Sequence, residues 1–452
     1  MDLNSIMIRR FLFPAMEKFK GNNIQKNIAH LKHSQSLTKH ELEILQKFKL
    51  KKLLLYCVDH VPAYSSYQSL KREIERDPLQ ALHRFPVLTK QAFRQRSSDY
   101  VSSLMDEASL IPNRTGGSTG EPVKFYIDRH TVEYYEAARY RGLSWWDIQI
   151  GERCAMIWGS PIELRENKKL SYKLKERFLK NRIVIPAYDL NPDSLQVYID
   201  TLNQFRPSYL YGYASSLYLL AKLMLRKSIF LNFIPKAVLS TSETLYDFQR
   251  EAIEEAFKCT TINEYGARDG GILAYQCPEK NMHLTQENAY IEIVDVHTKT
   301  PVEHGESGLV LVTDLNNFAM PRLRYELGDV AALSAKQCSC GIQLPLLEKI
   351  EGREDDIFVT PKGNYVHGHL FNHIARNLDG IQQFQAIQHS KTDITLKIVK
   401  NEQFTDKQIQ HFRNEILKSI GDIHLQVEFV NEIPRTQSGK TRYTFREFPL
   451  NM

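Results

Sequence analysis

The sequence lacks any long apolar run, and its 452 residues include only six cysteines. No stretch approaches the roughly 18 apolar residues that a helix needs to cross a bilayer. The early stretch MIRRFLFPAMEKF, residues 7–19, is too short and too charged for a signal peptide. We therefore expect a cytoplasmic protein without stable membrane insertion, in a compartment where disulfides are rare, and a shallow N-terminal amphipathic anchor is the alternative.

A large excess of charge of either sign is also absent, since 59 basic residues face 53 acidic ones. Nucleic-acid-binding proteins usually carry a stronger and more clustered basic bias, so we expect no nucleic-acid partner. The densest basic run, residues 164–182, has Leu and Phe at helical spacing, which indicates a solvated helix face. Hydrophobic residues at 42% and charged residues at 25% are ordinary values, so we expect globular domains with real cores.

The order of helix-like and strand-like stretches predicts a large α/β domain, residues 1–353, and a small α+β domain, residues 354–452. Residues 1–90 form a helical lead-in. In residues 110–280, runs such as KAVLSTS and TTINEYG alternate with helical stretches such as YDFQREAIEEAF, which is typical of an α/β core. Residues 285–350 change to strands with hairpin-like breaks, which predicts a β subdomain. The last hundred residues read as strand, strand, helix and strand.

One glycine-rich stretch, RTGGSTGEPVK at residues 114–124, raises the question of a ligand. Glycine lets the backbone approach a ligand closely, and exposed N–H groups and hydroxyls suit phosphate oxygens. A phosphate cradle is one interpretation, and an ordinary surface turn is the other.

Four stretches then follow one another in order along the chain. They are TGGSTGEP at 115–122, NEYGARD at 263–269, LRYELGD at 323–329 with GREDD at 352–356, and PRTQSGK at 434–440. Together they resemble the core motifs of the adenylate-forming superfamily of acyl-CoA synthetases, peptide-synthetase adenylation domains and luciferases. HVPAYSS and MPRLRYELGD are most similar to the phenylacetate-CoA ligase branch and its CapK-like relatives associated with capsular polysaccharide loci.

The similarity runs from about residue 50 to residue 446. It implies a large N-terminal adenylate-forming domain of mixed sheets and helices with a β subdomain, followed by a small C-terminal α+β lid. It also implies that the protein activates a carboxylic acid with ATP and Mg²⁺.

The resemblance further assigns nucleotide-binding roles. For the β and γ phosphates it implies the side chains of Thr115, Ser118 and Thr119 and the backbone of Gly116, Gly117 and Gly120. For the adenine it implies Asn263 at the ring edge and Tyr265 stacked on the ring, followed by Gly266. For the turn beside the adenine and acyl pocket it implies Ser242 and Glu243. For the ribose it implies Asp329, whose carboxylate suits two hydroxyl donors, and Arg353.

The catalytic residues that the resemblance implies are Lys440, on the lid, and the pair Arg268 and Asp269. Lys440 would offset negative charge as the carboxylate attacks the α-phosphate. The family usually has a hydroxyl residue and Glu where this chain has Arg268 and Asp269, so Mg²⁺ ligation here depends on a shorter carboxylate. Arg268 is expected to contact either phosphate or a neighbouring carboxylate. Asp355 matches the hinge position of the lid.

Three aromatic residues at expected strand ends are candidates for the acyl site: Trp158, Tyr211 and Tyr213. The alternative is that they belong to the core, as aromatic residues at strand ends often do.

Two clusters of cysteine and histidine suggest a metal that ATP chemistry does not need. CPEKNMH sets Cys277 and His283 six positions apart, and CSCG supplies Cys338 and Cys340. Four such ligands suit tetrahedral Zn²⁺ in a structural site. Free cysteines beside a surface loop are the alternative.

We therefore expect a ligase that forms an acyl-adenylate and passes the acyl group to a thiol, either CoA or a carrier protein's phosphopantetheine. An amine acceptor, on an amino acid or on a sugar of a surface polysaccharide, is the nearest alternative. A non-catalytic nucleotide-binding protein on the same fold is a further one.

Overall fold

The computed structural model describes residues 3–115, 123–158, 174–187, 190, 193–353, 356–363, 365–375, 378, 380–434 and 442–448. The chain forms two compact units. The first comprises Met1–Leu327 and Ala331–Ile350, and the second comprises Gly328–Val330 and Glu351–Met452.

The first hundred residues are helical, as the spacing of their apolar residues predicts. The longest helix, α4, begins at a capping box in which Thr38 and Glu41 satisfy each other's backbone N–H groups. Its buried leucines form a core with the helices that follow. The elements are α1 (Leu3–Met7), η1 (Ile8–Leu12), α2 (Phe13–Lys20), α3 (Ile24–Ser34), α4 (Lys39–His60), η2 (Pro62–Leu70), α5 (Lys71–Arg76), α6 (Pro78–Leu82), α7 (Lys90–Gln95), η3 (Ser97–Tyr100) and η4 (Glu107–Ser109).

A hairpin and one large sheet follow. The hairpin pairs β1 (Ile111–Arg114) with β2 (Lys124–Ile127), antiparallel. The large sheet has the order β10-β11-β12-β13-β9-β8-β7-β6-β5-β3-β4 among the described strands. These are β3 (Cys154–Trp158), β4 (Arg182–Pro186), β5 (Tyr209–Tyr213), β6 (Ala237–Thr241), β7 (Thr260–Ala267), β8 (Gly271–Gln276), β9 (Met282–Leu284), β10 (Ala289–Val294), β11 (Gly308–Asp314), β12 (Tyr325–Ser334) and β13 (Leu346–Arg353).

The sheet changes character at β7. From β4 to β7 the neighbouring strands run parallel. The pairs β7–β8, β8–β9, β9–β13 and β10–β11 are antiparallel. The strands of the expected β subdomain are present, but they continue the main sheet rather than forming a sheet of their own, because β8 and β9 carry the pairing from β7 to β13.

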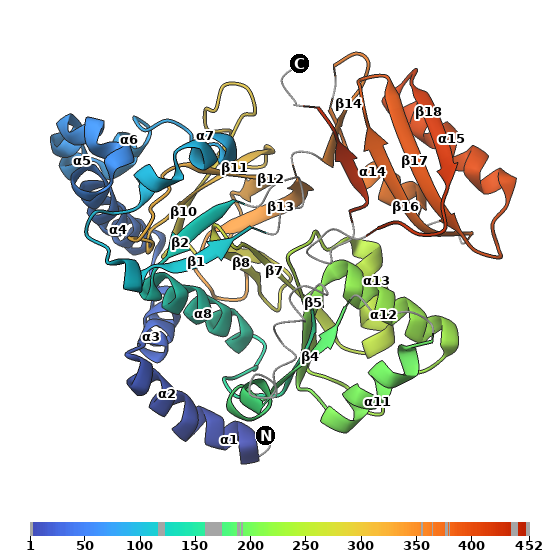
Figure 1. Ribbon diagram of the computed structural model, residues 1–452, viewed down its shortest axis with the longest axis horizontal. Coiled ribbons are helices and arrows are strands. Elements are labelled where there is room, and N and C mark those ends of the chain that lie inside the picture. The colour runs from blue at the N-terminus through green and yellow to red at the C-terminus, as the bar shows by residue number, and fades with distance from the viewer. Residues whose placement is uncertain are drawn as a thin grey trace. The chain divides into compact units, whose positions relative to one another are not determined.

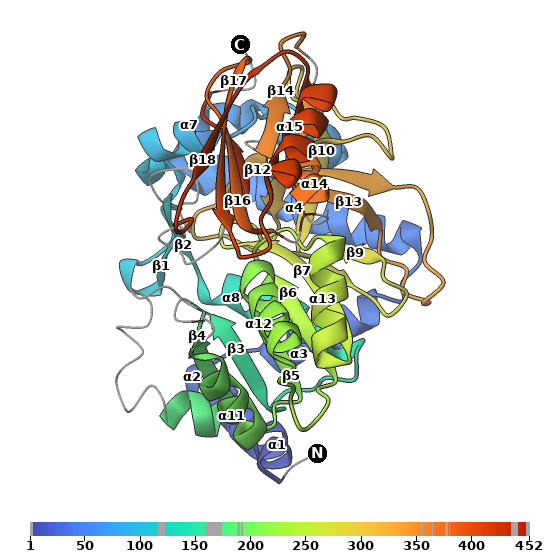
Figure 2. The ribbon, with the colours of Figure 1, turned by 90° about the vertical axis from the view of Figure 1, so that its right-hand side faces the viewer.

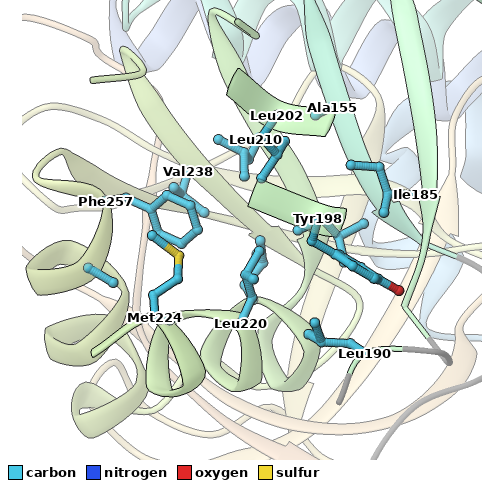
Figure 3. Packing of buried hydrophobic residues seen from close by; sticks show 14 of the residues in the cluster. Ala155, Ile185, Leu190, Tyr198, Leu202, Leu210, Leu220, Met224, Val238 and Phe257 are labelled. Carbon is cyan, nitrogen blue, oxygen red and sulfur yellow. The ribbon is translucent and has the colours of Figure 1, made fainter. Parts of the chain in front are cut away.

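Helices cover both faces of the parallel strands. On one face lie α11 (Leu195–Phe205), α12 (Ala214–Lys227) and α13 (Asp247–Phe257), and on the other lie α3 and α8 (Arg129–Ser144) (Figures 1 and 2). Alternate residues of each strand supply the two cores, as the pleat requires. Leu210 and Val238 belong to the core under α11–α13, whereas Tyr211 and Leu239 face α8. Figure 3 shows the first of these cores, in which Phe257 and Met224 lie against Val238.

The second unit is a small α+β domain, as the sequence predicts. Its four-stranded sheet has the order β18-β17-β16-β19, and α15 begins at a capping box of Thr405 and Gln408. Phe384, Phe412 and Ile416 lie in its buried core. The elements are β14 (Ile357–Val359), β15 (Tyr365–His367), α14 (His369–Ala375), β16 (Ile381–Gln388), β17 (Asp393–Lys400), α15 (Asp406–Ile420), β18 (His424–Phe429) and β19 (Thr444–Arg446).

Two other features concern the basic run and the possibility of a membrane-spanning helix. Within the basic run 164–182, the described residues form η5 (Lys175–Leu179), a short π-helix, and Arg182 begins β4. Among the helices in the described part of the chain, none combines the length and the apolar character that crossing a bilayer requires.

Candidate active site

The parallel strands end at a common edge, where α/β proteins usually bind their ligands. The register pairs Tyr213 of β5 with Thr241 of β6, and Thr241 with Glu264 of β7. Trp158 is the last residue of β3. Side chains that are far apart in the sequence therefore reach one edge of the sheet.

The buried carboxylate of Glu264 lies at this edge. Its Oε1 accepts hydrogen bonds from the Tyr211 hydroxyl at 2.7 Å and from the Thr241 hydroxyl at 3.0 Å. Burial and this neighbouring carboxylate hold the pKa of Tyr211 well above its usual value, so the phenol remains a donor. The other oxygen, Oε2 of Glu264, lies 3.5 Å from Nε of Arg139, and neither atom has a hydrogen-bond partner among the residues that the structure describes.

The three aromatic candidates lie together beside this carboxylate. The Trp158 ring stacks on Tyr211 at 5.7 Å and lies 4.3 Å from the Tyr213 ring, centre to centre. Tyr213 is only 2% exposed and belongs to the core under α11–α13, whereas Trp158 is partly exposed. Of the three, Trp158 therefore has the most surface for a ligand.

The glycine-rich stretch connects the two strands of the β1–β2 hairpin. Its expected phosphate ligands Gly116, Gly117, Ser118, Thr119 and Gly120 lie outside the described residues. Both ends are fixed, because Thr115 N–H donates to the Val123 carbonyl at 3.0 Å and Val123 N–H donates to the Thr115 hydroxyl at 2.9 Å. The stretch between these two residues therefore begins and ends at fixed positions. A loop that positions phosphate groups needs such fixed ends.

The NEYGARD stretch forms the end of β7 and the turn into β8. Asn263 N–H donates to the side-chain carbonyl of Gln276 at 3.0 Å. Tyr265 is 9% exposed and packs in the core beneath the hairpin. Gly266 has no room for a side chain, since a Cβ would lie 2.6 Å from the Gly271 carbonyl oxygen. Arg268 is exposed to solvent.

Asp269, at the turn, is held by Arg322, which lies just before β12, and by Tyr325, the first residue of β12. Its Oδ2 accepts a hydrogen bond from the Tyr325 hydroxyl at 3.0 Å, and its carbonyl accepts one from Arg322 at 2.9 Å. The Arg322 guanidinium also lies 4.5 Å from the centre of the Phe125 ring on β2, and its NH1 has no hydrogen-bond partner in the described part of the chain. Arg322 therefore links the hairpin of the glycine-rich stretch to the turn that carries Asp269.

Ser242 and Glu243 form the turn after β6. Ser242 has a φ of +67°, which is uncommon for a residue with a side chain. The Glu243 carboxylate accepts from the Ser215 backbone N–H at 2.7 Å and from its hydroxyl at 3.0 Å. This carboxylate thus stabilises the N-terminus of α12, whose first N–H groups have no partner within the helix.

The expected ribose pair lies in the second unit. Arg353 NH1 is 3.2 Å from Oδ1 of Asp329. The expected hinge residue Asp355 lies outside the described residues, but its neighbour Asp356 accepts a hydrogen bond from Arg353 N–H at 3.1 Å. Removal of the carboxylate from water raises the pKa of Asp356 to about 7, against the opposing effect of these contacts.

This raised pKa predicts a pH-dependent stability of the second unit. The folded state binds the Asp356 proton more tightly than the unfolded state does, so stability falls as the pH rises from about 4 to about 7. Asp356→Asn should remove this fall in stability with rising pH. Relative to the parent protein, the variant should gain about 1–2 kcal/mol between pH 4.5 and pH 7.5, a figure that allows for partial solvent exposure.

Urea unfolding followed by circular dichroism at each pH would measure the difference. A stability difference between Asp356→Asn and the parent protein that stays constant with pH would contradict the prediction. Fluorescence separates the two units, since the three tryptophans, Trp145, Trp146 and Trp158, all belong to the first.

The four expected metal ligands lie together in the first unit. The ligand atoms of Cys277, His283, Cys338 and Cys340 are all within 4.8 Å of one another. His283 Nε2 is 3.3 Å from the Cys340 sulfur, and its Nδ1 is 3.0 Å from the Leu344 carbonyl, which fixes the tautomer with Nε2 free to ligate. Burial lowers the pKa of His283, which favours the neutral form that binds metals.

Comparison with known proteins shows which proteins this chain is similar to. Residues 358–447 match the family model of the CapK C-terminal domain. Protein CapK of Staphylococcus aureus is 25% identical over 80% of this chain and 79% of its own length. Phenylacetate-coenzyme A ligase of Thermus thermophilus is 21% identical over 90% of this chain and 97% of its own length. The chain is thus similar to Protein CapK and to phenylacetate-coenzyme A ligase over most of its length.

Two further proteins are similar to this chain. The crystal structure of 2-hydroxyisobutyryl-CoA ligase in its postadenylation state has the same fold as this chain, with a TM-score of 0.69 at 18% identity over 91% of each chain. Indoleacetate–lysine synthetase of Pseudomonas savastanoi is 30% identical over 142 residues, which is 31% of this chain and 33% of that protein.

Reading the sequence did not identify two members of the site, Glu264 and Arg322. A signal for Glu264 was available, since it is the one charged residue in TTINEYG, an otherwise uncharged run that forms a strand. Arg322 carried no such signal, because its contacts to Phe125 and Asp269 join segments distant in the sequence. Lys440 and the middle of the glycine-rich stretch lie outside the described residues, so their roles stay predictions.

Proposed function

We propose that the protein activates a carboxylic acid with ATP and transfers the acyl group to a thiol. The observation that carries this proposal is the similarity to phenylacetate-coenzyme A ligase over nearly the whole length of both chains. The arrangement of the glycine-rich hairpin, the Asp269 turn and the ends of β3, β5, β6 and β7 supports it. Two of the relatives are named phenylacetate-coenzyme A ligase, and the solved 2-hydroxyisobutyryl-CoA ligase with the same fold is in complex with R3-HIB-AMP in its postadenylation state.

Two steps make up the proposed reaction. A carboxylate oxygen of the acid attacks the α-phosphorus of ATP, forming the acyl-adenylate and releasing pyrophosphate. The thiol sulfur then attacks the acyl carbonyl carbon, a thioester forms, and AMP leaves as the C–O bond breaks. The thiol proton passes to solvent or to a base.

The chain's own residues would hold the reactants. Backbone N–H groups and hydroxyls of residues 115–120 would bind the β and γ phosphates, and Lys440 would neutralise charge where the carboxylate meets the α-phosphate. Asp329 and Arg353 would bind the ribose. Mg²⁺, when bound, would neutralise phosphate charge, and Asp269 is the carboxylate that fits it, although one of its oxygens already accepts from Tyr325.

The acid is expected to carry a polar group. Glu264 Oε2 is a buried acceptor at the ligand edge that pairs with the Arg139 guanidinium at 3.5 Å but has no hydrogen-bond donor among the described residues, and a hydroxyl or ammonium group on the acid would supply one. Trp158 offers an apolar surface beside it. Candidate acids should therefore include hydroxy acids, amino acids and aryl acids.

Mass spectrometry of the products tests the proposal. Protein, ATP, Mg²⁺ and each acid are incubated with CoA, with amines or with neither. We expect an acyl-adenylate without acceptor and an acyl-CoA when CoA is present. AMP release without any acyl product would contradict acyl transfer.

An amide-forming reaction is the second candidate. The relative named indoleacetate–lysine synthetase favours it, because its identity to this chain, 30%, exceeds that of the CoA ligases, although over a shorter stretch. In that case the nucleophile is an amine nitrogen, the product is an amide, and AMP leaves as before. An amide product with lysine or an amino sugar, and no thioester with CoA, would decide for this alternative.

We also propose that Cys277, His283, Cys338 and Cys340 bind one structural Zn²⁺. Three thiolates and one imidazole form a tetrahedral donor set, and the cluster joins the β8–β9 turn to the segment between β12 and β13. Purified protein should contain about one equivalent of zinc, and Cys338→Ser with Cys340→Ser should reduce this to about a tenth. The melting temperature should fall by at least about 4 °C.

A matched control for the zinc prediction is Cys259→Ser, which changes a cysteine outside the cluster. Metal analysis and thermal melting measure both effects. Equal zinc content in the double variant and in the control would contradict the proposed site.

A further inference from the structure

The first helical segment exposes its large apolar side chains. Residues 3–20 run through α1, η1 and α2 without a break. Leu3 is 87% exposed, Met7 46%, Phe11 67% and Phe19 91%. These four residues, here called the outer stripe, would normally face the core of a globular protein.

The opposite face of the segment attaches it to the first unit through smaller contacts. Ser5 and Ile8 are buried, and Ile8 packs against Gly151, where a Cβ would lie 3.1 Å from it. The Asn181 amide donates to the Ser5 hydroxyl at 3.2 Å and accepts from Asn4 at 3.1 Å. In Figure 1, α1 and α2 lie in line at the edge of this unit, beyond α3 and α8. The segment is thus docked by one face while the outer stripe remains in solvent.

The spacing of the outer stripe matches the helix geometry. Its members stand at intervals of four or eight residues, and in a pure α-helix of 3.6 residues per turn such a row drifts around the axis. The π-helical turn Ile8–Leu12 lies in the middle of the row. A π-turn contains more residues than an α-turn. It therefore offsets the drift of the row around the helix axis and keeps the four side chains near one face.

The charges around the outer stripe are cationic. Arg10, Lys18 and Lys20 are exposed. The acidic residue of the described segment, Glu17, is 8% exposed, and its carboxylate accepts from Gln25 N–H at 3.1 Å. An apolar face bordered by basic side chains suits the interface of an anionic bilayer, where apolar groups enter the acyl boundary and cations meet phosphate headgroups.

We propose that residues 3–20 dock the protein on the surface of an anionic lipid bilayer. The segment lies in the plane of the interface, with the outer stripe in the acyl boundary and Arg10, Lys18 and Lys20 among the headgroups. The attachment is peripheral and reversible, since a single short amphipathic helix holds it. The activated acid would then be transferred close to a membrane surface.

Sedimentation of the full-length protein with vesicles tests this proposal. Vesicles of phosphatidylcholine with phosphatidylglycerol should bind at least about tenfold more protein than phosphatidylcholine alone, and high salt should weaken the binding. A variant with Leu3→Ser, Phe11→Ser and Phe19→Ser should bind at least about tenfold more weakly. A variant with Arg10→Gln, Lys18→Gln and Lys20→Gln should lose the preference for phosphatidylglycerol.

The control variant changes three equally exposed apolar residues elsewhere, with Phe48→Ser, Val197→Ser and Ile234→Ser. It should bind vesicles like the parent protein, and thermal melting should show that all variants are folded. Absence of binding to anionic vesicles, or equal loss in the control, would overturn the proposal. So would a dimer that the outer-stripe variant dissociates in the absence of lipid binding, because a second copy would then cover the stripe.

Discussion

Replacing Glu287 with alanine is expected to lower the unfolding free energy of the first unit by about 3–5 kcal/mol. Glu287 is 2% exposed, and its Oε1 lies 2.6 Å from NH1 of Arg141, whose side chain is fully buried. The same oxygen accepts from the Ser34 hydroxyl at 2.5 Å. The variant would leave a buried guanidinium without its counter-charge, and such a charge is costly away from water.

The Glu287 carboxylate, with its two partners Arg141 and Ser34, joins three distant parts of the first unit. Arg141 is on α8, Ser34 ends α3, and Glu287 lies between β9 and β10. Lys49 of α4 also donates to the Glu287 carbonyl at 2.7 Å. Loss of the carboxylate therefore removes the Ser34 hydrogen bond of α3 together with the ion pair, whereas the Lys49 bond to the backbone carbonyl can remain.

Urea unfolding followed by tryptophan fluorescence measures this effect, because all three indoles belong to the first unit. A double variant, Arg141→Met with Glu287→Leu, should be more stable than Glu287→Ala, since no unpaired charge remains. Asp99→Asn, which breaks an exposed pair with Arg96, should change stability by less than about 0.5 kcal/mol. Similar losses in Asp99→Asn and Glu287→Ala would contradict the prediction.

Replacing Lys440 with alanine is expected to slow adenylate formation by about 10²–10³-fold. The reaction brings two anions together, and a cation at the point of attack stabilises charge that develops in the transition state. Binding of the acid and of ATP should change much less than the rate. The fold should be unaffected, since the change removes a single side chain from a stretch without apolar residues other than proline.

Single-turnover formation of the acyl-adenylate, measured by quenching and mass spectrometry, tests this prediction. Lys336→Ala is the matched control, because the Lys336 side chain is 78% exposed and pairs with Glu348 at the surface, so its removal should leave the rate unchanged. If Lys440→Ala forms the adenylate as fast as Lys336→Ala, Lys440 has no part in the first step.

The fold could be predicted largely because its strands follow simple rules. Parallel strands that are covered on both faces are largely apolar runs, and the part of KAVLSTS that forms β6, Ala237–Thr241, is buried throughout. β4 was not predicted, because RIVIP is short and directly follows a strongly basic run. The large sheet was expected in two parts, since no local signal shows that β8 and β9 join them.

The candidate site was predictable where function depends on local sequence. Cysteines and histidine at close spacing indicated a metal cluster, and the structure brings all four side chains together. Glu264 and Arg322 depend instead on partners such as Tyr211 and Phe125, which only the folded chain places beside them. Burial was also hard to foresee, since Tyr213 is in the core while Trp158 at the end of the neighbouring strand is partly exposed.

The exchange of pyrophosphate into ATP, measured for the full-length protein with a panel of carboxylic acids, tests the central claim most directly. Reversible adenylation predicts exchange that depends on at least one acid and exceeds that of Lys440→Ala by at least about tenfold. Exchange needs no acyl acceptor, so the result does not depend on whether a thiol or an amine receives the acyl group. If no acid in a panel of aryl, hydroxy and amino acids raises exchange above the level of Lys440→Ala, the protein does not activate carboxylates in the proposed way.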